Sequence, residues 1–93
     1  MSGKVRGDLE RKCDTFEQAL GFVITELRVK PGWGYERVAR QVGCDPAYMK
    51  GIECGRRDPT VDLLWAIAHL HGLTLSRLFL LGERKYKRDG KEK

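Results

Sequence analysis

The chain has 93 residues, of which 41% are hydrophobic and 33% are charged, and its formal net charge is +5. This length and balance predict one small globular domain and exclude a disordered or fibrous chain. No apolar run approaches the ~20 residues of a membrane-spanning helix, and the polar start lacks the apolar segment of a secretory signal. We therefore expect a cytoplasmic protein without a membrane partner.

The positive charge is concentrated at the carboxyl end. Basic residues outnumber acidic residues by three in residues 83–93, but by only one in residues 1–14 and one in residues 15–82. The overall charge is therefore weak evidence for a nucleic-acid partner. The three cysteines (Cys13, Cys44 and Cys54) are odd in number and form no ligand-spaced cluster, which predicts reduced thiols and no metal site.

The first predicted helix follows a polar stretch. Residues 1–14 are mixed in charge and predict a flexible or partly helical arm. Asp14, with Glu17 three residues later, resembles a capping box that begins a helix. One face of this helix is apolar at helical spacing: Phe16, Ala19, Leu20, Val23, Ile24 and Leu27. Pro31 and two glycines predict a turn over residues 31–34, which ends the helix near residue 29 or 30.

Two short helices joined by a tight turn are predicted over residues 35–54. Their inward faces consist of residues at helical spacing: Val38, Ala39 and Val42, then Tyr48, Met49 and Ile52. Gly43 supplies the left-handed residue that ends the first helix, and Asp45 caps the second, with Pro46 at its first position. A small residue at Ala39, four positions before a glycine, is the spacing of a helix-turn-helix.

Two further helices complete the predicted fold. Thr60 caps a helix that runs to about residue 71 and stops at Gly72, and Thr74 caps the last one. Their inward residues are Leu63, Leu64, Ile67 and Leu70, then Leu75, Leu78, Phe79 and Leu81. The charged residues 83–93 predict a disordered basic tail. The sequence thus predicts an all-α fold of five helices, with one domain over residues 15–82.

Several short motifs support a family resemblance over residues 22–81. They are Leu27-Arg28, Val38-Ala39, Gly43, Tyr48-Met49, Ile52-Glu53, Gly55 and Arg57-Asp58-Pro59-Thr60. Together they resemble the Cro/C1-type (XRE-like) helix-turn-helix domain, which implies a compact lambda-repressor-like fold. Within that family, the run that contains Asp45, Tyr48 and residues 51–53 resembles the corresponding run of the controller proteins of restriction–modification systems. The resemblance also implies a structural ion pair between Arg28 and Glu53.

The resemblance implies binding to double-stranded DNA, with the helix over residues 46–54 in the major groove. Its outward residues are Pro46, Ala47, Lys50 and Gly51, with Tyr48 at the edge. Pro46 and Ala47 carry no side-chain hydrogen-bonding group, so direct base reading is expected to be sparse. Further contacts to phosphate or groove are expected from Tyr35, Tyr48, Arg56 and Arg57. Recognition is therefore expected to rely on the DNA backbone and shape.

A single recognition helix covers few base pairs, so a homodimer on a palindromic operator is expected. The predicted dimer interface is the surplus apolar surface at the end of the domain: Leu75, Phe79, Leu80 and Leu81. No catalytic set or phosphate-binding glycine loop occurs, so no enzyme activity, cofactor or small-molecule ligand is predicted. Two functions stay open at this point: a transcriptional regulator, or an antitoxin or other protein-interaction module that retains the fold.

Overall fold

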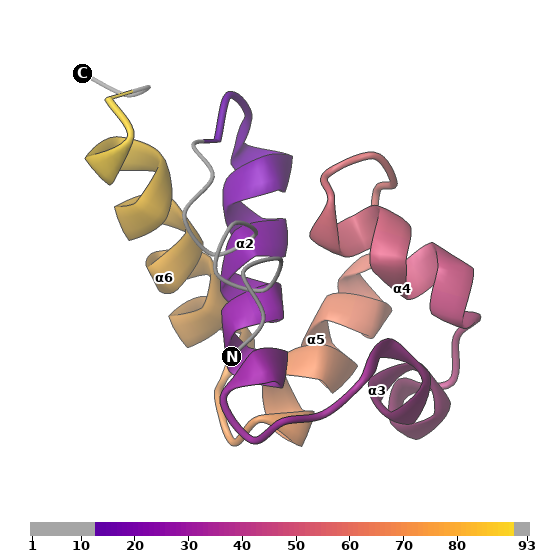
Figure 1. Cartoon of the computed structure of the whole chain (residues 1–93). Helices are drawn as coiled ribbons and strands as arrows, with labels where there is room; N and C mark the ends of the chain where they lie inside the picture. The colour runs from indigo at the N-terminus through magenta and orange to yellow at the C-terminus, as the bar shows by residue number, and fades with distance from the viewer. Residues whose placement is uncertain (1–12, 91–93) are drawn as a thin grey trace.

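The computed structural model describes residues 13–90, which form five helices (Figure 1): α2 (Phe16–Val29), α3 (Tyr35–Val42), α4 (Pro46–Glu53), α5 (Val61–Leu70) and α6 (Leu75–Arg88). No strand occurs within this part of the chain. The predicted all-α fold with five helices is therefore confirmed. Most of the predicted amino-terminal arm and the last three residues of the predicted tail lie outside the described residues.

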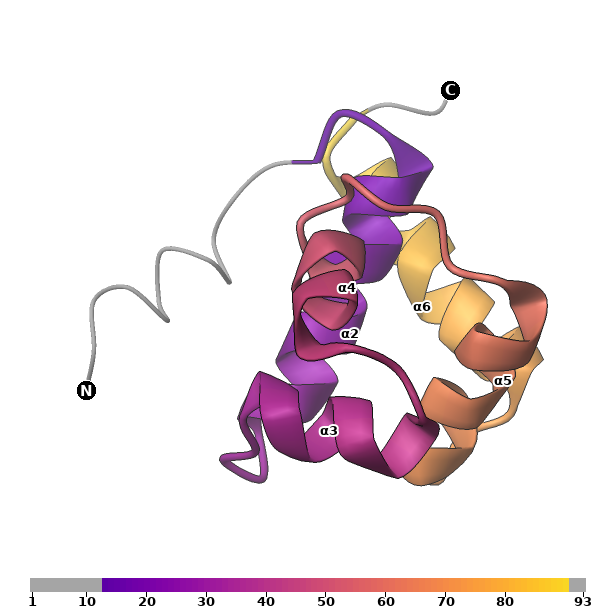
Figure 2. The ribbon, with the colours of Figure 1, turned by 90° about the vertical axis from the view of Figure 1, so that its right-hand side faces the viewer.

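Helix α2 lies at the centre of the arrangement. Helix α6 packs along one side of α2, and α4 packs against it on the other. Helix α3 packs against α4 and α5, and α5 also contacts α6. The two views in Figures 1 and 2 show that α3 and α4 lie on the opposite side of α2 from α6. The outer surfaces of α3 and α4 are therefore presented together, away from α6.

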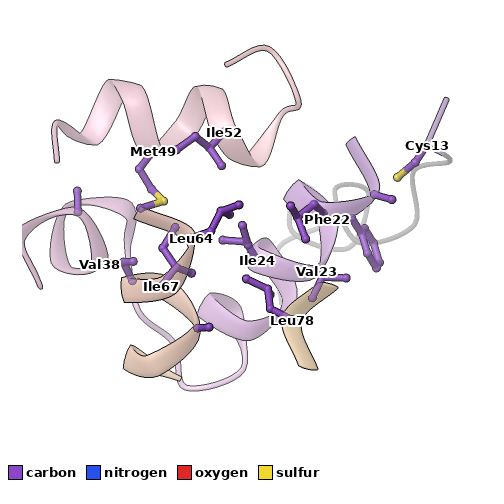
Figure 3. Packing of buried hydrophobic residues seen from close by; sticks show 14 residues of the cluster. Cys13, Phe22, Val23, Ile24, Val38, Met49, Ile52, Leu64, Ile67 and Leu78 are labelled. Atoms are coloured by element: carbon purple, nitrogen blue, oxygen red, sulfur yellow. The ribbon is translucent and has the colours of Figure 1, made fainter. Parts of the chain in front are cut away.

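All five helices contribute side chains to the core, as Figure 3 shows. The buried apolar residues are Cys13, Ala19, Leu20, Phe22, Val23, Ile24, Val38, Ala39, Met49, Ile52, Leu64, Ile67, Ala68 and Leu78. Removing an isoleucine or leucine side chain of this size from water contributes about 1.5–3 kcal/mol. The inward faces predicted for α3 and α4 thus hold both helices against the rest of the domain.

Threonine side chains begin three of the helices. Thr60 and Thr74 accept hydrogen bonds from backbone N–H groups three residues later, as predicted. The cap of α2 differs, because Thr15, rather than Asp14, is the N-cap residue. Thr15 Oγ1 accepts a hydrogen bond from the N–H of Gln18 at 3.1 Å, and Gln18 Oε1 accepts one from the N–H of Asp14 at 2.6 Å. The predicted capping box was therefore one residue too early, since threonine and glutamine at this spacing also supply one.

Helix α6 continues to residue 88, so the prediction of a disordered tail from residue 83 is wrong for the described residues. The Lys85 side chain is only 8% exposed; its Nζ lies 3.2 Å from Asp89 Oδ1 and 4.2 Å from the centre of the Phe22 ring. Asp89 Oδ2 also accepts a hydrogen bond from the N–H of Cys13 at 2.7 Å. Burial alone would raise the pKa of Asp89, but these hydrogen bonds and the nearby positive charges hold it below its usual value. These contacts among Cys13, Lys85 and Asp89 join the two ends of the domain.

Candidate nucleic-acid interface

The turn between α3 and α4 fixes where α4 begins. Gly43 has φ 81° and ψ 37°, a left-handed conformation that glycine adopts without strain, and its N–H donates to Ala39 O at 2.8 Å. Asp45 Oδ2 then accepts a hydrogen bond from the N–H of Ala47 at 3.2 Å, and Pro46 occupies the first position of the helix. The predicted turn chemistry is confirmed. It sets which residues of the first turn of α4 face outward.

The first turns of α3 and α4 form one exposed surface. A shallow open hollow beside these turns is lined by Gly34, Tyr35, Glu36, Pro46, Ala47 and, from the last turn of α4, Lys50; these six residues are termed the α3–α4 face. Four of the residues predicted to contact DNA are therefore on one surface: Tyr35, Pro46, Ala47 and Lys50. The α3–α4 face contains one cation and one carboxylate, Lys50 and Glu36, so its charge is balanced.

Gly51 does not face outward, so its predicted place among the outward residues of α4 is wrong. The residue is buried, because the Arg57 side chain lies across it: a Cβ atom at residue 51 would be only 2.4 Å from Arg57 Cγ. The chain after α4 folds back over the helix at this position, where the N–H groups of Arg56 and Arg57 donate to Gly51 O at 2.8 and 3.2 Å. Both arginines are exposed, as predicted.

Tyr48 supports the loop that follows α4. Its hydroxyl donates a hydrogen bond to Asp58 O at 2.7 Å, and its ring centre lies 5.4 Å from Arg57 Cζ. The phenolic proton predicted to reach a phosphate is therefore used inside the protein. Tyr48 instead connects α4 to the segment that carries Arg56 and Arg57, which places these cations at the opposite end of α4 from Pro46.

A buried ion pair holds α4 against α2. Arg28 Nε donates to Glu53 Oε2 at 2.7 Å and Arg28 Nη2 donates to Glu53 Oε1 at 2.9 Å, as the family resemblance implies. Thr25 Oγ1 donates to Glu53 Oε1 at 3.0 Å, and Arg28 Nη1 donates to Trp33 O at 2.9 Å. The Tyr35 ring centre lies 4.2 Å from Arg28 Cζ. The roles of Thr25 and Trp33 were not predicted, although both are within five residues of Arg28.

Three of the residues predicted to form the dimer interface, Leu75, Phe79 and Leu80, line an exposed groove on α6. The groove is apolar and is lined by Leu75, Ser76, Phe79, Leu80 and Glu83. Phe79 is 37% exposed, and its ring centre lies 5.9 Å from that of Phe16. Leu81 does not line this groove; it is half-buried and, like Leu75, packs against the core. The helical rotation from Leu80 to Leu81 turns the side chain away from the groove.

The remaining titratable side chains define no second site in the described residues. Within residues 13–90, no three His, Cys, Asp or Glu side chains form a group that could hold a metal ion. All three cysteines are free thiols. Burial, followed by the negative charge of Asp45, raises the pKa of the Cys44 thiol and favours its protonated form. None of the helices described is by itself long and apolar enough to cross a membrane.

An all-α fold in which a left-handed glycine joins two short helices, the second with its first turn exposed, defines a helix-turn-helix protein. The comparison with protein families gives the same class. Residues 19–78 match the family model described as "Helix-turn-helix domain", and the chain therefore belongs to this family. No curated protein has a significantly similar sequence.

Solved structures with the same fold include two of the clp gene regulator ClgR from Corynebacterium glutamicum. One has a TM-score of 0.77 at 20% identity, covering 82% of this chain and 81% of that chain. The other has a TM-score of 0.72 at 19% identity, covering 83% and 97%. A hypothetical transcription factor, NHTF from Neisseria, has a TM-score of 0.68 at 26% identity, covering 80% and 85%.

Proposed function

We propose that this protein is a sequence-specific transcriptional regulator of the Cro/C1 type that binds double-stranded DNA. The observation that carries the proposal is the exposed first turn of α4, which lies beside the first turn of α3 while Met49 and Ile52 anchor the helix in the core. In helix-turn-helix proteins the second helix enters the major groove with its first residues, while the first helix crosses the backbone. The family membership supports the same role.

The chemistry of the interface favours backbone and shape recognition. Pro46 and Ala47 offer only apolar contact, for instance to a thymine methyl group, and their small size permits close approach. Lys50 in the last turn of α4, with Arg56 and Arg57 after the helix, supplies exposed positive charge toward the carboxyl end of α4. Phosphate contacts from such cations fix position, and deformable DNA sequences supply selectivity where few bases are contacted.

A homodimer on a palindromic operator completes the proposal. The apolar groove lined by Leu75, Phe79 and Leu80 lies on α6, away from α4, so that two copies joined there keep both α3–α4 faces free. Half-sites for such a dimer lie about 34–36 Å apart, one turn of the duplex.

Selection of bound oligonucleotides from a random pool tests the proposed function. At about 100 mM salt, we expect enrichment of a palindromic sequence. Lys50→Ala should weaken binding of the selected site about 10-fold, because one direct contact of this kind is worth roughly 1–3 kcal/mol. Arg77→Ala is the matched control, since Arg77 is an exposed cation on α6, and it should leave the affinity unchanged. Failure of the unaltered protein to bind any duplex, even at low salt, would contradict the proposal.

Replacing Phe79 and Leu80 together by serine should convert the dimer to a monomer and weaken operator binding. The reason is that the serine hydroxyls remove most of the apolar area that a partner copy would cover. Analytical ultracentrifugation should then give the monomer mass of 10.6 kDa instead of twice that value. Trp65→Ser provides a control, because Trp65 is 53% exposed on α5, outside the groove. An unchanged mass for the double variant would place the interface elsewhere.

One observation favours a second function, that of an antitoxin or other protein-interaction module. Val61 and Trp65 lie one helical turn apart on α5 and are 66% and 53% exposed, and the α3–α4 face presents two residues without hydrogen-bonding side chains. Exposed apolar residues of this size are typical of protein-binding surfaces. A protein that enriches no oligonucleotide but binds another small protein would have this function.

A further inference from the structure

The outward side of α5 combines apolar, acidic and aromatic side chains. Trp65 follows Val61 by four residues and Asp62 by three, and His69 follows Trp65 by four, so all four residues share one side of the helix. All four are exposed, Val61 by 66% and Trp65 by 53%. None of them lines the α3–α4 face or the groove on α6. These four residues are termed the α5 face.

The Trp65 indole is held in place by its neighbour on the helix. The His69 imidazole stacks on it, with ring centres 3.8 Å apart and ring planes inclined by 25°. His69 Nδ1 lies 3.0 Å from Trp65 O, and because a carbonyl oxygen only accepts, the Nδ1–H group donates. The two side chains restrain each other while the indole stays more than half exposed. A fixed aromatic ring loses little entropy when a partner covers it.

Asp62 places a negative charge on the same face. Within residues 13–90, no cationic side chain lies at ion-pair distance from its carboxylate. Asp45 brings a second carboxylate to this end of α5: burial and, after it, the charge of Asp45 raise the pKa of the Cys44 thiol, which lines a hollow together with Asp62. The α5 face itself contains no lysine or arginine. Its charge is therefore opposite in sign to the net charge of +5 of the whole chain.

A carboxylate near an exposed indole suits a cationic side chain. Arginine can stack its planar guanidinium on an indole while its N–H groups pair with a carboxylate. Val61 offers apolar contact one turn away from Trp65. Nucleic acid is disfavoured, because Asp62 repels phosphate and the α5 face has no cation to offset that repulsion. The combination therefore favours a protein partner that carries positive charge.

We propose that the α5 face is a docking site for a protein segment that places an arginine against Trp65 and Asp62 and an apolar side chain on Val61. This inference goes beyond DNA binding and does not depend on it, because the α5 face and the α3–α4 face share no residue. It also names the chemistry of the partner for an interaction function, which the exposure of Val61 and Trp65 alone leaves open.

Selection of short random peptides displayed on phage, against the full chain and in parallel against Trp65→Ala, tests the inference. The unaltered chain should enrich peptides with an arginine next to an apolar residue, and Trp65→Ala should not. For one such peptide, made synthetically, Trp65→Ala should lower the affinity roughly 30-fold, the loss typical of a central tryptophan in an interface. Phe79→Ala is the matched control, because Phe79 is 37% exposed on α6, and it should leave the affinity unchanged.

Asp62→Asn tests the charge separately from the apolar contact. It should lower the affinity for the same peptide about 3-fold at low salt, because an exposed ion pair is worth little, and the difference should disappear at high salt. Glu83→Gln is its control, since Glu83 is an exposed carboxylate on α6. Enriched peptides without a cation, or an affinity that does not change in Asp62→Asn, would overturn the inference.

Nuclear magnetic resonance of the unaltered chain gives a readout that requires no variant to bind. The chain has two tryptophans, and the spectrum of Trp65→Ala identifies which indole N–H signal belongs to Trp65. The peptide should shift that signal and leave the Trp33 signal in place; the opposite result would overturn the inference. Weaker operator binding by Trp65→Ala would assign the α5 face to DNA, and a reduced mass would assign it to a second copy; either would also overturn it. An operator selected without any peptide would leave the DNA-binding function standing and the inference wrong.

Discussion

Glu53→Gln is expected to lower the free energy of unfolding by about 3–5 kcal/mol, the range observed when one partner of a buried ion pair is removed. The Glu53 side chain is only 2% exposed, and its two oxygens accept hydrogen bonds from Arg28 and Thr25. Glutamine has the same shape, but its amide NH₂ would face donors, and the Arg28 guanidinium would keep its charge without a carboxylate. The loss is therefore electrostatic and not a matter of volume.

Urea denaturation of the variant and the unaltered chain measures this difference. Glu36→Gln is the matched control, because Glu36 is an exposed carboxylate in the first turn of α3 and should change stability by less than about 1 kcal/mol. Replacing both partners, Arg28→Met with Glu53→Leu, should recover part of the loss, since no uncompensated charge remains. A loss below about 1 kcal/mol for Glu53→Gln would mean that the pair is not buried in solution.

Most helix boundaries, although not the end of α6, could be predicted because the signals that set them are local. Each of these signals acts on backbone groups that lie within four residues of it. The signals are Gly43, the Asp45-Pro46 pair, Thr60 and Thr74. Their effect depends on the order of residues and hardly on the rest of the fold. The one shifted helix start, from Asp14 to Thr15, arose where two overlapping capping patterns compete and the choice between them lies in side-chain geometry.

The errors occurred where segments distant from a helix cover it. Helical spacing places Gly51 on the outer side of α4, and only the return of the loop carrying Arg57 buries it. The same loop engages the Tyr48 hydroxyl. In α6, the charged composition suggested solvation, yet the Lys85 side chain is buried, and its ammonium lies over the Phe22 ring and beside Asp89. Long side chains can bury their apolar stems in this way, which composition does not reveal.

The exposed start of α4 could be predicted, whereas the additional hydrogen bonds made by the ion pair that supports this helix could not. The family resemblance named Arg28 and Glu53, but Thr25 and Trp33 join them through contacts that depend on how α2, α4 and the turn meet. The close approach of α2 to α4 was also not predicted. It depends on Gly21, which lies one helical turn before Thr25 and carries no side-chain signal of its own.

Gly21→Ala is expected to destabilise the protein by about 3 kcal/mol, because the added methyl group would collide with backbone. A Cβ atom at residue 21 would be 2.5 Å from the carbonyl oxygens of both Ile52 and Glu53. Rotamer changes cannot relieve a clash with backbone, so α4 must move away from α2. The gain of about 1 kcal/mol from the higher helix propensity of alanine is too small to compensate.

Gly34→Ala tests whether the effect comes from the contact and not from losing a glycine. Gly34 has φ −89°, and no atom lies within 4 Å of the position that a Cβ atom would take there, so its replacement should cost no more than about 1 kcal/mol as a change of N-cap residue. Thermal and urea unfolding of both variants provide the comparison. If Gly21→Ala is as stable as the unaltered chain, helices α2 and α4 lie farther apart in solution than described.

Gly21→Ala and Glu53→Gln should also be coupled. The single hydroxyl proton of Thr25 is shared between Gly21 O at 2.8 Å and Glu53 Oε1 at 3.0 Å, so the helix crossing and the ion pair share one hydrogen-bonding group. Moving α4 away from α2 lengthens the contacts that Glu53→Gln also weakens. The double variant should therefore lose less than the sum of the single losses, by about 0.5–3 kcal/mol, as for residues within one network. Strict additivity would mean that Glu53 keeps its partners when the crossing widens, and that the ion pair, not the close approach at Gly21, sets the position of α4.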